Sequence, residues 1–339
     1  MSRFSRFFPE HKMSPCIQRL IALPYTEQKS ALWLKQREQY ITASEFANCF
    51  NLSEDVVNPY IREFGLEETF YPDSTKSAGK DGRQKYIQKK SGEGDIFTGN
   101  QATRFGQRYE NVAIRIYQQM KQMDVFEFGL VPHRTIKHLG ASPDGCSVDG
   151  TLVEIKCPST RTPTGTPPFE YWCQMQSQME CCDAPSCDFF DASFVEYIDH
   201  ESWATRAADW EKNHPNATHH VFGMYYLPNQ GGEAVFAPVT VVRVREFETW
   251  FASEIKKADL FDNPTPVYYH LCEYFLTPVK RDQKWFTDRM AEVSAVWTEI
   301  SCRRQQGVTG RPKTVPENKP VAPKKRLTED LIKYTKCLI

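Results

Sequence analysis

The sequence predicts a mixed α/β fold in which a central mixed β-sheet is flanked by helices and followed by a C-terminal helical extension. Residues 105–120 predict an amphipathic helix, because apolar side chains recur there at three- and four-residue intervals. The Asp149-Gly150 pair is a strong hairpin signal, and a strand is expected after it at 152–156. The other expected elements are a helix around 171–179, strands at 188–198, 221–227 and 234–244, and helices near 246–260 and 282–303.

The composition is that of an ordinary globular protein. The chain has 339 residues, of which 40% are hydrophobic and 25% charged, and its formal net charge is -1. This length suits one large core with a tail. A charge near zero argues against a coating or histone-like role, because any binding to nucleic acid must use local basic patches or bound cations. No stretch reaches the roughly 18 uninterrupted apolar residues that a membrane span requires, so no membrane association is expected.

The cysteines predict free thiols. There are 11 of them, an odd number, and no secretory leader precedes them, which indicates a reducing, intracellular compartment. Cys181, Cys182 and Cys187 lie close together but lack a Cys-x-x-Cys pair and a clear fourth ligand. We therefore expect buried thiols at these positions rather than a zinc ion or an iron–sulfur cluster.

The chain is expected to have three parts. Residues 1–26 are expected to be irregular, residues 27–304 to form the main domain, and residues 305–339 to form a flexible basic tail. Within the main domain, residues 72–102 are rich in Gly and Lys and almost lack an apolar period, which predicts a long inserted loop. The tail contains Pro-Lys-Lys-Arg at 323–326, which we interpret as a solubilising end rather than a nuclear import signal.

A first helix is expected to carry Trp33 and Arg37 and to stop just before a second start signal. That signal is the sequence Thr42-Ala43-Ser44-Glu45. It is a capping box, in which the Thr42 hydroxyl and the Glu45 carboxylate each satisfy a backbone donor of a new helix. A helix is therefore expected to begin at about residue 43. Taken alone, the arginine fits a surface position and the tryptophan fits the core.

The most informative segment is Ser142-Pro143-Asp144-Gly145, followed ten residues after the aspartate by Glu154-Ile155-Lys156. Side chains alternate between the faces of a strand, so Glu154 and Lys156 should share a face. If the hairpin folds back, Asp144 arrives beside Glu154. Converging carboxylates repel each other, and a hard cation such as Mg²⁺ relieves that repulsion. With Lys156 alongside to orient a water or stabilise a phosphate, the arrangement suits phosphodiester hydrolysis.

Each of these groups also has a plainer interpretation. The pattern of Asp144, Glu154 and Lys156 also fits the solvent-exposed face of a surface hairpin. Glu110, at the start of the preceding helix, fits an ordinary N-terminal acid as well as a third metal-binding carboxylate. The segment Gln174-Met175-Gln176 fits a solvated helix face as well as amides that contact a phosphate or the water. The order of these groups along the chain favours the nuclease interpretation.

Six motifs follow one another along the chain. They are Trp33-x-x-x-Arg37, Ile41-Thr42-Ala43-Ser44, Gly106-x-x-Tyr109-Glu110-Asn111, Ser142-Pro143-Asp144-Gly145, Glu154-Ile155-Lys156-Cys157-Pro158 and Gln174-Met175-Gln176. In this order they resemble the motifs of the lambda-exonuclease/YqaJ-type viral recombinase nucleases, a branch of the PD-(D/E)XK superfamily. The resemblance covers residues from about 30 to 200, and it implies a restriction-endonuclease-like core.

The resemblance implies a metal centre with Mg²⁺ as the cofactor and Mn²⁺ able to replace it. Asp144 and Glu154 would be metal ligands, the Ile155 carbonyl would be a further ligand, and Glu110 would contribute directly or through water. All three acids would also be catalytic residues.

Two further roles follow from the same resemblance. Lys156 would be the catalytic lysine, and Gln176 would assist at the same centre. Arg37 and Ser44 would bind the 5′-phosphate of a DNA end. General chemistry agrees with the phosphate assignment, because arginine grips phosphate through two parallel hydrogen bonds and a capped helix N-terminus attracts anions.

Members of this family act on the ends of double-stranded DNA, some as trimeric rings, and pair with a single-strand annealing protein. The resemblance therefore implies a Mg²⁺-dependent 5′ to 3′ exodeoxyribonuclease for recombination, repair or replication, of viral origin and located in host cytoplasm or nucleus. One alternative is an alkaline-type nuclease with endonuclease or RNA-degrading activity, and another is a non-catalytic module that binds DNA ends. The 72–102 insertion and everything beyond about residue 245 depart from the compact phage pattern.

Overall fold

The fold is built on two β-sheets. The computed structural model describes residues 14–67, 80–93, 100–197, 199–215, 221–227, 234–238, 241, 243–257, 264 and 266–307. The larger sheet has seven strands, in the order β2 (Val125–Phe126), β5 (Gly145–Ser147), β6 (Leu152–Lys156), β7 (Ser186–Tyr197), β10 (Pro266–Lys280), β8 (Phe222–Tyr226) and β9 (Val235–Phe236). The smaller sheet has the order β1 (Ile41–Thr42), β4 (Leu139–Ala141) and β3 (Val131–Pro132).

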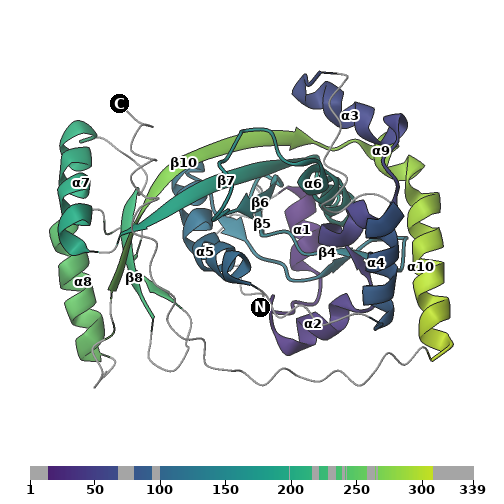
Figure 1. The fold of residues 1–339 in the computed structure, drawn as a ribbon, viewed down its shortest axis with the longest axis horizontal. Helices are drawn as coiled ribbons and strands as arrows, with labels where there is room; N and C mark the ends of the chain where they lie inside the picture. Colours follow the sequence, from purple (N-terminus) through teal and green to yellow (C-terminus); the bar gives the residue numbers. More distant parts are fainter. Residues whose placement is uncertain are drawn as a thin grey trace.

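The larger sheet is mixed, as predicted. Strands β6 and β7 pair in parallel, whereas the other neighbours in this sheet pair antiparallel. Two long strands, β7 and β10, run through the middle of it, and Figure 1 shows them joining the part of the molecule around α6 to the part around α7 and α8.

Two helices cover opposite faces of strand β6. Helix α5 (Gln101–Lys121) packs on one face, where Val153 and Ile155 share an apolar cluster with residues of α5 such as Tyr109. Helix α6 (Phe169–Cys182) packs on the other face, where Leu152 joins the core around it. Because side chains alternate along a strand, Glu154 lies on the α6 face.

The remaining helices form two groups. The first surrounds α6 and consists of α1 (Pro15–Ile21), α2 (Ala31–Arg37), the 3₁₀ helix η2 (Ala43–Cys49), α3 (Glu54–Phe64), α4 (Lys80–Ser91), α9 (Gln283–Asp288) and α10 (Met290–Gln305), with α4 beside α10 (Figure 1). The second consists of α7 (His200–Asn213) and α8 (Val244–Lys257), which pack around Trp203 and Phe247. Within the described residues, no helix combines the length and the apolar character needed to cross a membrane.

The predicted α/β fold with a C-terminal helical extension is confirmed, but three local predictions are wrong and one long strand was missed. Residues 1–26 are not irregular throughout, since Ser14 caps helix α1, which packs into the core. The 72–102 segment is not a loop over 80–91, where α4 lies, and α5 begins at Gln101. The strand expected at 234–244 covers only Val235–Phe236, because α8 begins at Val244. Strand β10 was not expected. Residues 308–339, most of the proposed tail, lie outside the described residues.

Candidate functional site

A tight hairpin positions the central acids. Strands β5 and β6 pair antiparallel with Gly145 opposite Val153, which confirms the predicted hairpin. The Asp149 carboxylate holds the turn by accepting hydrogen bonds from the Ser147 hydroxyl at 2.6 Å and the Thr151 N–H at 3.0 Å. Gly150 completes the turn at a φ of +93°, a left-handed conformation that favours glycine, and a Cβ there would lie 2.5 Å from the Ser14 hydroxyl.

Asp144 lies directly before β5, at the end of the sheet. Its Oδ2 accepts a hydrogen bond from the Ile155 N–H at 2.6 Å, so the aspartate and strand β6 are in direct contact. The pairing of β5 with β6, continued by one residue, places Asp144 opposite Glu154. Burial and the charges of Glu154 and Glu110 raise the pKa of Asp144 well above its usual value. The crowding of carboxylates that the sequence predicts is therefore present.

Glu154 is fully buried under helix α6. Its Oε1 accepts hydrogen bonds from the Lys156 ammonium and from the Gln174 amide, the latter at 2.7 Å. Its Oε2 accepts one hydrogen bond, from the Gln178 amide at 2.7 Å. A carboxylate offers about four lone-pair sites, so Oε2 retains one site that can accept a further partner. Gln178 was not among the predicted site residues, although it follows Gln174 by one helical turn and therefore shares its face.

Lys156 lies beside Glu154, as the strand alternation predicts. Its side chain is 24% exposed, and its ammonium lies 4.7 Å from the centre of the Tyr171 ring. Burial alone would lower the pKa of Lys156, but the charges of Glu154 and Asp144 raise it above the usual value. The lysine is therefore held as a cation at the edge of the buried acids.

Glu110 lies on α5, across a pocket from the hairpin. It is in the middle of that helix rather than in its first turn, because α5 begins nine residues earlier at Gln101. Its carboxylate accepts a hydrogen bond from the Lys29 ammonium at 3.1 Å. Glu110 and Asp144 both line a pocket of about 370 Å³, which also includes Gln28 and Lys29.

Gln176 does not contact the predicted centre. Its Nε2 donates to the Lys280 carbonyl at 2.8 Å, and its Oε1 accepts from the Asp282 N–H at 2.7 Å. The prediction that this residue assists at the centre is therefore wrong in its geometry. Residues two apart on a helix face away from each other, so Gln174 and Gln176 cannot serve the same acid. Gln176 instead ties the end of β10 to α6.

The acids fit a hard divalent cation in their chemistry. Asp144, Glu154 and Glu110 offer carboxylate oxygens, which Mg²⁺ and Mn²⁺ prefer, and the mutual repulsion at Asp144 favours a cation there. In the conformation described, however, no three Asp, Glu, His or Cys side chains among the described residues are grouped as metal ligands.

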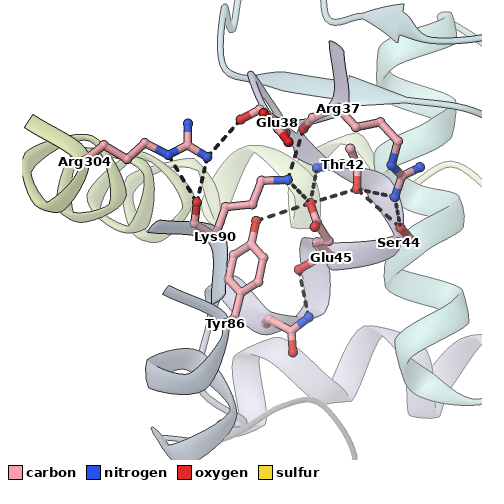
Figure 2. A network of polar contacts seen from close by, with 9 residues as sticks. Arg37, Glu38, Thr42, Ser44, Glu45, Tyr86, Lys90 and Arg304 are labelled. Carbon is pink, nitrogen blue, oxygen red and sulfur yellow. Dashed lines mark hydrogen bonds and ion pairs between the residues drawn. The ribbon is translucent and has the colours of Figure 1, made fainter. Parts of the chain in front are cut away.

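A second polar site lies around Arg37 at the end of α2. One guanidinium nitrogen donates to the hydroxyls of Thr42 and Ser44, both at 3.1 Å (Figure 2). The guanidinium also lies over the Trp33 ring, 4.4 Å from its centre, in a cation–π contact. Arg37 and Ser44 are therefore brought together, as predicted for a phosphate site.

The capping box is present, but the helix that follows differs from the expected one. Both hydrogen bonds between Thr42 and Glu45 form. The helix is a seven-residue 3₁₀ helix, and Glu45 places a negative charge in its first turn. The N-terminus of η2 therefore does not provide an anion site by itself, and anion binding here depends on Arg37 and the two hydroxyls.

The two polar sites are physically joined. Strand β1, which ends at Thr42, pairs in parallel with β4, and β4 leads directly into the segment that carries Asp144. The Trp33 indole N–H also donates to the Ser142 hydroxyl at 3.0 Å. The same side chain therefore contacts Arg37 through its ring and the loop before Asp144 through its nitrogen.

Comparison with known proteins finds a match to the same family that the motifs resemble. Residues 32–185 match the YqaJ-like viral recombinase domain family. An uncharacterized protein of Acanthamoeba polyphaga mimivirus is 25% identical over 324 residues, which covers 84% of this chain and 54% of that protein. The chain thus spans about half the length of that relative.

Two solved structures of exonucleases are similar at a lower level. An alkaline exonuclease from Laribacter hongkongensis is 24% identical, with a TM-score of 0.46, and the match covers 82% of this chain and 95% of that one. A phage-related exonuclease from Haemophilus somnus is 11% identical, with a TM-score of 0.36, and the match covers 67% of this chain and 84% of that one.

Proposed function

We propose that the chain is a nuclease of the lambda-exonuclease type that hydrolyses linear double-stranded DNA from its 5′ ends with Mg²⁺ as cofactor, because residues 32–185 match the YqaJ-like viral recombinase domain family. The observation that carries the proposal is the hairpin, in which Asp144 contacts the backbone of Ile155 while Lys156 contacts Glu154. An aspartate, a glutamate and a lysine on adjacent strand ends are groups that can support metal-assisted phosphodiester hydrolysis.

The proposed metal ligands are Asp144, Glu154 through its Oε2, the Ile155 carbonyl, and Glu110 directly or through water. When bound, Mg²⁺ supplies Lewis acidity to the scissile phosphate. The Lys156 ammonium is charged and partly exposed, so it can donate a hydrogen bond to a phosphate oxygen or to the attacking water. The Gln174 and Gln178 amides orient Glu154 by binding its two oxygens.

Arg37 gives the proposed activity its preference for ends. Its guanidinium is fixed by Trp33 and by two hydroxyls, yet only one of its nitrogens is used in those two hydrogen bonds. The remaining N–H groups have no hydrogen-bond partner within the described part of the chain, so they can donate to a phosphate. We therefore propose that a 5′-phosphate binds at Arg37 and Ser44 while the next phosphodiester approaches the acids.

Duplexes labelled at either the 5′ or the 3′ end test this function. With Mg²⁺, linear duplex DNA should lose its 5′ label as short products while the 3′ label stays on shortening strands. The reverse order would contradict the proposed direction. Cleavage of closed circular DNA or of RNA at a similar rate would instead support the alkaline-type nuclease with a broader substrate range. We further propose that the chain forms a homo-oligomer, such as the trimeric ring of some members of the family that it resembles, and the solution mass of the same sample tests this.

A further inference from the structure

The proposed phosphate site contains an acid close to its arginine. The Glu45 Oε2 accepts hydrogen bonds from the Thr42 N–H at 3.0 Å and from the Thr42 hydroxyl at 2.8 Å. The same hydroxyl accepts a hydrogen bond from Arg37. A single hydroxyl therefore separates the carboxylate from the guanidinium. A negative charge at this range opposes the binding of any anion at Arg37.

Lys90 supplies a compensating charge from helix α4. Its ammonium donates to Glu45 Oε2 at 2.7 Å and to the Arg37 carbonyl at 3.1 Å (Figure 2). The Lys90 side chain is 11% exposed, so the ion pair is largely shielded from water. Burial alone would raise the pKa of the Glu45 carboxyl, but the charge and hydrogen bond of Lys90 lower it below the usual value. Burial also lowers the pKa of the Lys90 ammonium, and the charge and hydrogen bond of Glu45 oppose that shift. The 2.7 Å contact between the two groups is therefore an ion pair in which each charge stabilises the other.

Arg304 of helix α10 holds the backbone of Lys90 in place. Its guanidinium donates to the Lys90 carbonyl at 3.1 and 2.7 Å, and to the Glu38 carbonyl at 3.0 Å. Figure 2 shows Lys90 and Arg304 on one side of Glu45, with the Arg37 guanidinium and Ser44 on the other. The Lys-rich segment and the C-terminal extension, the two departures from the compact pattern, thus meet at the phosphate site.

We propose that Lys90 is a positioning residue that determines specificity for 5′-phosphorylated ends, because it neutralises Glu45 and leaves the Arg37 site with a net positive charge. The inference rests on the proposed function and deepens it. Arg37 (+1), Glu45 (−1) and Lys90 (+1) sum to +1. Loss of Lys90 leaves a sum of 0, loss of the Glu45 charge leaves +2, and loss of both leaves +1 again.

This charge count predicts a pattern that a purely structural role does not. A structural role predicts that either substitution harms the site and that the double variant is at least as poor as the worse single one. Charge compensation predicts that the two substitutions act in opposite directions and cancel in combination. For one unit of charge at this range, the effect on phosphate affinity is about tenfold.

The experiment measures binding rather than hydrolysis, so that it does not depend on turnover. All variants carry Asp144→Asn, and fluorescence anisotropy gives the ratio of dissociation constants for a short duplex with a 5′-hydroxyl and the same duplex with a 5′-phosphate. We expect Lys90→Met to lower this preference for phosphate about tenfold and Glu45→Gln to raise it. The Lys90→Met/Glu45→Gln double variant should return to the value of the Asp144→Asn parent, and Lys90→Arg should stay near it.

The outcomes separate this inference from the proposed function. A parent protein without preference for the phosphate overturns the assignment of Arg37, whatever the Lys90 variants do. A parent with a clear preference that Lys90→Met leaves unchanged overturns the role of Lys90 alone. If Lys90→Met does not fold, as judged by thermal melting, Glu45→Gln decides, and a fall in preference on that substitution contradicts charge compensation.

Discussion

Replacement of Lys156 by methionine should destabilise the folded chain, in the absence of metal, by about 3 kcal/mol. The reason is the position of Glu154, whose side chain is only 1% exposed and whose Oε1 accepts a hydrogen bond from the Lys156 ammonium. Removal of one partner of a buried ion pair costs about 3–5 kcal/mol, because the other charge is left without compensation. The Gln174 and Gln178 amides still bind the carboxylate, which places the loss at the lower end of that range.

A double variant isolates the charge from the packing. Glu154→Gln/Lys156→Met removes both charges, so it should recover most of the stability that Lys156→Met alone loses. Urea denaturation followed by tryptophan fluorescence, in the presence of a chelator, measures Lys156→Met, Glu154→Gln and the double variant against the original protein. If Lys156→Met lowers the free energy of unfolding by the same amount whether or not Glu154 has been replaced, the two side chains are not coupled, and the proposed ion pair is refuted.

Three further results are expected. Arg37→Gln should lower the kcat/KM preference for 5′-phosphorylated over 5′-hydroxyl duplexes by about 10–100-fold, through loss of charged hydrogen bonds; an unchanged ratio would contradict the phosphate site. Gln178→Leu should weaken Mn²⁺ binding in calorimetry by about tenfold or more, whereas Gln176→Leu, whose native amide contacts β10, should leave it unchanged. Since Glu45 has a lowered pKa when folded, its stabilising effect is present above its unfolded pKa and is lost on acidification through the folded pKa. Thermal melts from pH 6 to pH 3 should therefore fall less steeply for Glu45→Gln; parallel curves would argue against the Lys90 pair.

Much of the central site could be predicted from the sequence because it is local. Asp144 and Glu154 lie ten residues apart on either side of a turn that Asp149-Gly150 specifies, so strand geometry alone brings them together. The same locality brings Arg37 and Ser44 together, since only seven residues separate them. Short-range patterns of this kind need no knowledge of the rest of the fold.

Contacts between distant segments were not predictable in the same way. Strand β10 pairs with β7 over twelve partner positions although about 80 residues separate them, and its alternation of buried and exposed side chains is weak. Lys90 looks like one of several lysines in a polar segment until α4 packs beside η2 and α10. Which of the three glutamines of α6 contact Glu154 depends on how the helix is rotated about its axis against the sheet. The sequence does not specify this rotation.

The most direct measurement is hydrolysis of linear duplex DNA by Asp144→Asn, compared with the original protein at equal Mg²⁺. The substitution is isosteric, and it removes a charge that burial and the neighbouring acids disfavour, so thermal stability should be equal or higher. The expected result is loss of DNA hydrolysis to the background rate in a fully folded protein. Retention of substantial activity by this variant would show that the chemistry takes place elsewhere and would contradict the proposed active site.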